Sequence, residues 1–123
     1  MLTLFTNITE QLTEFEKNTL VPMLLETLKH THIGNRYKGK DICTWFDACR
    51  CEVSEARLRK MVNYIRVTNA VKPNVLIGTS KGYFLTCDVK LVDEQIESLE
   101  GRIDSMSAVI DSLKAQKLNL QHR

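Results

Sequence analysis

Residues 54–86 read SEARLRKMVNYIRVTNAVKPNVLIGTSKGYFLT, and the spacing of the apolar side chains changes partway along this stretch. Ser54 is a typical N-cap residue, and the pattern after it predicts a helix over about 55–68. The core-facing residues expected on this helix are Leu58, Met61, Val62 and Ile65. Two β-branched and aromatic runs follow, at 75–79 and 83–86, and their short connection predicts a hairpin in which Gly82 takes a positive φ.

The residues before this stretch predict two further helices. Thr13 and Glu16 have the spacing of a capping box and begin the first helix. We expect its apolar face to hold Phe15, Leu20, Leu24 and Leu28. Pro22 lies inside this helix and predicts a kink, or a restart near Asn18. A second, short helix is expected over 40–48. We expect its core face to hold Ile42, Trp45 and Phe46.

Three helices followed by a hairpin are typical of the winged helix, a relative of the helix-turn-helix. In that fold the third helix lies in the major groove of DNA, and the hairpin, or wing, reaches the flanking backbone. The order therefore predicts a mainly α fold (α+β) with a winged-helix domain at 13–87. An N-terminal arm at 1–12 precedes it, and a C-terminal coiled-coil helix at 88–123 follows it.

The C-terminal helix has the pattern of an oligomerisation device. From Val89 to Leu120, apolar residues repeat with the alternating three- and four-residue spacing of a coiled-coil heptad. β-branched residues at most a positions and Leu or Met at most d positions favour a parallel dimer. The alternatives are antiparallel pairing and packing of this helix on the globular part. The residues expected at the dimer seam are Val92, Ile96, Leu99, Ile103, Met106, Ile110 and Leu113.

Three segments also resemble a known group of proteins. They are SEARLRKMVNYIR at 54–66, LIGTSKGYFLT at 76–86 and IESLEGRI at 96–103. In these segments the chain resembles small, mostly uncharacterised winged-helix proteins with a C-terminal helix that bacteriophages and prophages encode. The likeness spans about residues 13–110, and it implies the winged-helix fold, a phage or prophage source and DNA binding. The second predicted helix departs from the pattern because it is richer in aromatic residues and cysteine.

Charge is unevenly distributed along the chain. The net charge is only +2, but residues 36–81 carry ten Lys or Arg against four Asp or Glu, and both flanking segments are acidic. Such a basic segment suggests a polyanion partner, and the alternative is a solvated surface of ordinary charge. Together with the predicted winged helix, it favours double-stranded DNA. Planar groups such as those of Arg57 and Asn63 suit base edges, whereas Lys60 and Lys81 suit phosphate. The residues expected to contact DNA are Lys38, Lys40, Arg57, Arg59, Lys60, Asn63, Lys72 and Lys81.

No arrangement of residues in the sequence predicts catalysis or a bound metal. His30 and His32, like Cys49 and Cys51, are separated by one residue, which is too close for a zinc site. The sequence shows no nucleophile with an oriented base, no paired carboxylates and no glycine-rich phosphate loop. We therefore expect a protein that is not an enzyme and has no cofactor or metal.

The sequence also predicts where the protein acts and with what. No apolar run approaches the length of about 18 residues that a membrane span needs, and residues 1–8 are too short and polar for a secretory signal. We expect a cytoplasmic protein of a bacterial host cell, with reduced cysteines. Its expected partners are DNA and a second copy of itself. The alternative is a non-catalytic adaptor whose winged helix and coiled coil bind other proteins.

Overall fold

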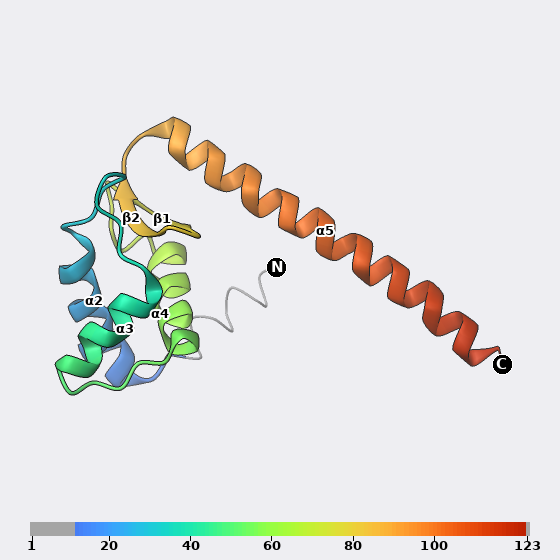
Figure 1. Ribbon diagram of the computed structural model, residues 1–123, viewed down its shortest axis with the longest axis horizontal. Helices are drawn as coiled ribbons and strands as arrows, with labels where there is room; N and C mark the ends of the chain where they lie inside the picture. The colour runs from blue at the N-terminus through green and yellow to red at the C-terminus, as the bar shows by residue number, and fades with distance from the viewer. Residues whose placement is uncertain (1–11, 123) are drawn as a thin grey trace. The chain divides into compact units, whose positions relative to one another are not determined.

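The computed structural model describes residues 12–122, and the chain divides into two compact units after Cys87. The described chain is mainly helical and contains one small antiparallel sheet (Figure 1). Its elements are η1 (Glu16–Leu20), α2 (Val21–Leu28), α3 (Gly39–Ala48), α4 (Glu55–Val67), β1 (Val75–Thr79), β2 (Gly82–Thr86) and α5 (Val89–Gln121). The predicted N-terminal arm, apart from Leu12, lies outside the described residues.

The first helix begins with the predicted capping box. The Thr13 amide donates to Glu16 Oε1 at 2.8 Å, and the Glu16 amide donates to Thr13 Oγ1 at 3.1 Å. The next turn, η1, is a π-helix, and the Val21 amide bonds to the Glu16 carbonyl five residues back. Pro22 then stands in the first turn of α2. Because a wider turn precedes Pro22, its missing N–H and bulky ring are accommodated without ending the helix. The expectation for Phe15 was wrong, since its side chain is 51% exposed.

The next two helices contribute most of the remaining core. Ile42 and Phe46, four residues apart on α3, are buried as predicted, but Trp45 is 38% exposed. Successive helical residues differ by about 100° around the axis, so Trp45 leaves the face that its neighbour occupies. Its indole packs edge-on against the Phe46 ring, with 4.9 Å between centroids. On α4, the Ser54 hydroxyl caps the first turn by accepting from the Arg57 amide at 3.1 Å, as predicted.

The hairpin has the predicted position, but β2 begins at Gly82, one residue earlier than predicted, so Ser80 and Lys81 alone connect the strands. Ile77 stands opposite Phe84 in the register of β1 and β2, and Gly82 has φ +125°. A third short segment joins the hairpin, because Tyr37 and Tyr83 exchange both backbone hydrogen bonds, at 3.0 and 2.8 Å. The connection between α2 and α3 is therefore tied to β2.

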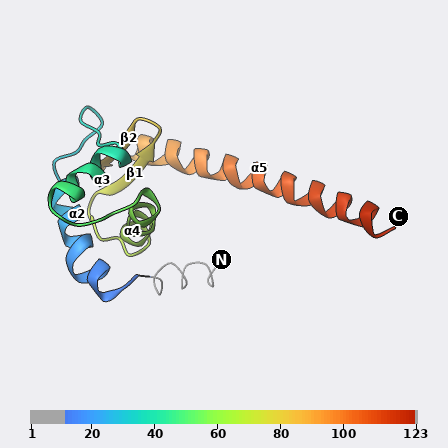
Figure 2. The same cartoon turned by 60° about the horizontal axis from the view of Figure 1, so that its bottom comes forward.

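One hydrophobic core joins these elements. Figure 2 shows α2, α3 and α4 grouped together beside the hairpin. The buried apolar residues are Leu12, Leu20, Val21, Leu24, Leu28, Ile42, Phe46, Val53, Leu58, Met61, Val62, Ile65, Leu76, Ile77 and Phe84. Every helix and strand of the first unit contributes at least one buried residue, and all the buried apolar residues except Ile77 and Phe84 form one cluster.

The second unit is the long helix α5, which has no buried residue. The Asp88 carboxylate caps it by accepting from the Lys90 amide at 3.0 Å. The predicted seam is exposed from Ile96 onward, including Ile103 at 56% and Met106 at 64%. No helix within residues 12–122 is both long and apolar enough to cross a membrane.

Candidate nucleic-acid interface

Most of the residues expected to contact DNA are accessible. Arg57 and Lys60 are partly buried, whereas the other six of the eight side chains are exposed. The exposed residues are Lys38, Lys40, Arg59, Asn63, Lys72 and Lys81. Among the described residues, the five exposed cations in this group form no ion pair with an acidic side chain. They are available to an external anion.

The start of α3 lies against both α4 and the hairpin. A Cβ built on Gly39 would stand 3.5 Å from Leu58 Cδ2 and 3.7 Å from Tyr83 Cε2. Lys38 and Lys40 flank this glycine, so their backbones stand beside the first turn of α4 and beside β2. Lys81 occupies the loop that joins the two strands. Lys81 thus belongs to an element that adjoins the segment of Lys38 and Lys40, although some 40 residues separate them in sequence.

Arg57 and Lys60 face a carboxylate within the protein. Arg57 Nε lies 2.9 Å from Glu16 Oε2, and Lys60 Nζ lies 3.1 Å from Glu16 Oε1. Arg57 also donates from Nη1 to the Glu52 carbonyl at 3.0 Å, and its guanidinium lies over the Phe15 ring at 5.8 Å. These two cations hold the first helix against α4, and Glu16 already balances part of their charge.

The Glu16 carboxylate is buried and strongly ionised. Burial acts to raise its pKa, but the Thr13 amide and the Lys60 and Arg57 side chains outweigh burial and lower the pKa from 4.5 to about 2. A carboxylate that accepts several hydrogen bonds from cations and amides is held in its charged form. Glu16 therefore connects the capping box to α4 at any pH near neutrality.

Arg59 and Asn63 occupy a different face of α4. They lie four residues apart and both are exposed, whereas Leu58 and Val62 beside them are buried. Residues four apart share one side of a helix. Both side chains are therefore exposed, and their guanidinium and amide groups are of the kind that bonds base edges.

Two arginines that the sequence reasoning did not single out support the hairpin. The Arg36 guanidinium lies 5.0 Å from the Phe84 ring centroid, and its Nη1 donates to Thr79 Oγ1 at 3.3 Å. Arg66 donates from Nε to the Leu76 carbonyl at 3.2 Å, and its Nη2 would be 2.8 Å from a Cβ on Gly78. Arg66 lies seven residues after Arg59 on the same helix, which is the only signal in the sequence that could have singled it out, and the Leu76 carbonyl that accepts from it could not be predicted.

The cysteines and histidines do not form a metal cluster within residues 12–122, where no three His, Cys, Asp or Glu side chains group suitably. The four cysteines are free thiols. Burial, together with the nearby Glu55 carboxylate, raises the pKa of the Cys43 thiol. A raised pKa lowers the fraction of Cys43 that is present as thiolate.

Comparison of the chain with protein-family models, with curated proteins and with solved structures found no match. The candidate interface therefore rests on the placement of its own residues.

Proposed function

We propose that the protein is a dimeric, non-catalytic winged-helix DNA-binding protein with a regulatory role, of phage or prophage origin. The observation that carries this proposal is the group of exposed basic side chains on three adjoining elements. These elements are the start of α3, the outer face of α4 and the loop between β1 and β2. The acceptor expected for such a group is the DNA backbone.

The order of elements supports the winged-helix assignment. A helix, a short bridging segment at Tyr37, two further helices and a hairpin follow one another along the chain. In winged-helix proteins the third helix enters the major groove and the hairpin lies beside it. In this assignment α4 is the recognition helix and the loop at Lys81 is the tip of the wing.

Exposure and contacts divide the residues expected to contact DNA into three roles. Arg59 and Asn63 would read base edges, because they are exposed and their planar groups allow paired hydrogen bonds. Lys38, Lys40 and Lys81 would meet phosphates. Arg57 and Lys60, expected at first to contact DNA themselves, would instead fix the orientation of α4 through Glu16.

Dimerisation through α5 would supply the second recognition helix. A helix of 33 residues without a buried side chain lacks the tertiary packing that ordinarily stabilises helices in water. Its apolar residues follow heptad spacing, and a helix with such a seam pairs with the same seam on a second copy of the chain. Two copies would then address two half-sites on DNA.

A salt titration tests DNA binding. Fluorescence anisotropy with a labelled mixed-sequence duplex should show an affinity that falls with salt, with a logarithmic slope of about −0.9 for each phosphate contact. Lys81→Ala should reduce this slope by about one. Lys29→Ala is the matched control, because Lys29 is an exposed cation of the α2 end that pairs with Glu26 at 2.6 Å. The absence of binding at low salt would support the adaptor alternative instead.

Selection of a preferred sequence from a random duplex pool separates the residues that would read bases from those that would orient α4. Arg59→Ala and Asn63→Ala should each lose about 1–3 kcal/mol on the selected sequence and little on random DNA. Arg57→Ala should lower the free energy of unfolding. When it is assayed below its melting temperature, it should keep most of its preference for the selected sequence over random DNA. If Arg57→Ala alone abolishes sequence preference in the folded protein, the assignment of roles is wrong.

Light scattering tests the dimer. The parent should have twice the mass of one chain at micromolar concentration. Ile103→Asp should give a monomer, because two carboxylates would face each other at the seam without partners. Ala108→Asp, at an outward heptad position, is the matched control and should remain a dimer. A monomeric parent would exclude the dimer.

A further inference from the structure

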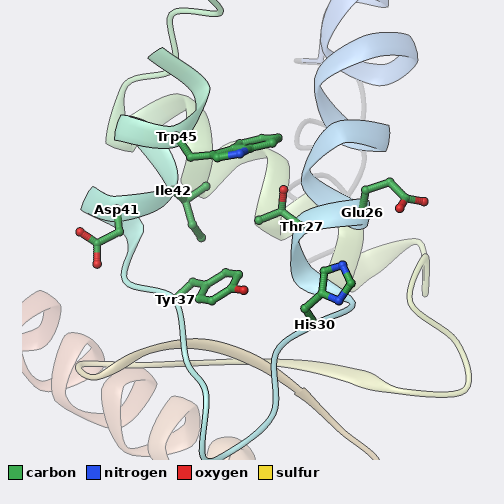
Figure 3. A pocket seen from close by; sticks show the side chains of 7 residues that line it. All are labelled: Glu26, Thr27, His30, Tyr37, Asp41, Ile42 and Trp45. Atoms are coloured by element: carbon green, nitrogen blue, oxygen red, sulfur yellow. The ribbon is translucent and has the colours of Figure 1, made fainter. Parts of the chain in front are cut away.

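A pocket of about 490 Å³ lies between α2 and α3 (Figure 3). Its volume is within the range of small-molecule sites, which is roughly 300–1,000 Å³. Its lining residues are Glu26, Thr27, His30, Tyr37, Asp41, Ile42 and Trp45. None of them belongs to the basic surface proposed to contact DNA.

The interior of the pocket is formed mainly by aromatic and aliphatic groups. Figure 3 shows the Trp45 indole and the Tyr37 ring reaching into the space between the two helices, with Ile42 between them. The Thr27 hydroxyl donates its proton to the Met23 carbonyl at 3.1 Å, so toward the pocket its oxygen can only accept a hydrogen bond. Trp45 keeps 38% of its surface exposed, although its neighbour Phe46 is fully buried. A ligand in the pocket would cover this indole.

The rim of the pocket carries negative charge. Asp41 stands on α3 and Glu26 on α2, and their carboxylates lie on opposite sides of the pocket and extend away from its interior (Figure 3). Neither lysine nor arginine is among the seven lining residues, which contrasts with the basic composition of residues 36–81. Lys29 pairs with Glu26 at 2.6 Å, but both side chains are more than half exposed, so water screens this pair.

We propose that this pocket binds an organic cation, a guanidinium or ammonium group on a short aliphatic stem. The stem would lie against Ile42 and the two rings, and the cation would stand over a ring face near the mouth. The electron-rich face of Trp attracts cations more strongly than that of any other side chain. Of the two rim carboxylates, Glu26 pairs with Lys29, whereas Asp41 forms no ion pair within residues 12–122 and favours the same sign of charge. The ligand can be a free small molecule or the basic side chain of a polypeptide.

Trp45 is the only tryptophan of the chain, so its fluorescence reports directly on the pocket. The folded full-length protein would be titrated at constant ionic strength with n-butylguanidinium chloride, and with n-butanol as the neutral probe with the same stem. The cation should change the Trp45 emission and bind about 2- to 30-fold more tightly than the alcohol. A blocked Gly-Arg-Gly peptide separates the two sources. Binding at least as tight as that of the free cation indicates a polypeptide ligand, and weaker binding indicates a small molecule.

A pair of variants on the same helix isolates the effect of charge. Asp41→Asn should lower the affinity for the cation about 2- to 5-fold and leave that for butanol unchanged. Asp47→Asn removes an identical charge from an exposed position outside the pocket and should change neither affinity. Melting curves of both variants exclude unfolding as the cause. Equal affinities for the cation and the alcohol, or a ratio that Asp41→Asn leaves unchanged, would overturn the proposal.

Discussion

Replacing Glu16 by Gln removes one charge from the contact that joins the first helix to α4. Gln retains an acceptor for the Thr13 amide, since Glu and Gln both serve in a capping box. The pKa of Glu16 lies about 2.5 below its ordinary value, and each pKa unit is worth about 1.36 kcal/mol, so ionised Glu16 stabilises the fold by at most about 3 kcal/mol. Arg57 and Lys60 are 31% and 29% exposed and can turn toward water in the variant. We therefore expect Glu16→Gln to lose about 2 kcal/mol at pH 7.

The same contact predicts a specific pH dependence. Because the folded-state pKa is lowered, the stabilisation is fully present above the unfolded value of 4.5 and is lost as the pH falls toward about 2. The parent should lose stability through this window, and Glu16→Gln should lose less. The difference between the two proteins should thus shrink as the pH falls from 4.5 through about 2, and it should disappear only below that folded-state pKa.

Urea unfolding followed by circular dichroism measures this difference. The curves would be recorded at one protein concentration, because association contributes to the stability of an oligomer. Glu14→Gln is the matched control, since Glu14 is an exposed carboxylate of the same turn that accepts from Asn18 at 3.1 Å. It should change stability by less than about 0.5 kcal/mol. A loss for Glu16→Gln no larger than that of the control, or one independent of pH, would refute the reasoning.

Four further substitutions test the packing of the first unit and the α5 helix by the same unfolding assay. Phe46→Ala should cost about 3–5 kcal/mol, because it empties a fully buried position; a cost equal to that of Trp45→Ala would contradict the difference in burial. Gly82→Ala should cost about 1–3 kcal/mol, since Gly82 has φ +125° and its added Cβ would stand 2.8 Å from the Tyr37 carbonyl group. Gly101→Ala should have the opposite sign and stabilise by about 0.5–1 kcal/mol, because nothing lies within 4 Å of its Cβ position; a loss of stability would show a contact on this face of α5.

Local sequence patterns predicted the helices and strands of this chain, whereas long-range contacts determine which of their side chains are buried. The Thr13–Glu16 capping box, the Ser54 cap and the positive φ of Gly82 depend on neighbouring residues only, and all three predictions are confirmed. Phe15 and Trp45 were expected in the core and are exposed. Helical spacing indicates which residues share a face, but it does not locate the edge of that face when a bulky residue lies near the boundary.

The candidate interface shows the same division. The concentration of positive charge between residues 36 and 81 was evident from composition, and six of the eight expected contact residues are exposed. The salt bridges of Arg57 and Lys60 with Glu16 were not predicted. Arg57 and Glu16 are 41 positions apart in the sequence, and neither segment alone indicates that they pair. A basic residue on a helix can thus serve a ligand or an internal acid, and only its three-dimensional neighbours distinguish the two. Because Arg57 pairs with Glu16, the arginine that we propose to contact base edges is Arg59, two residues further along the same helix.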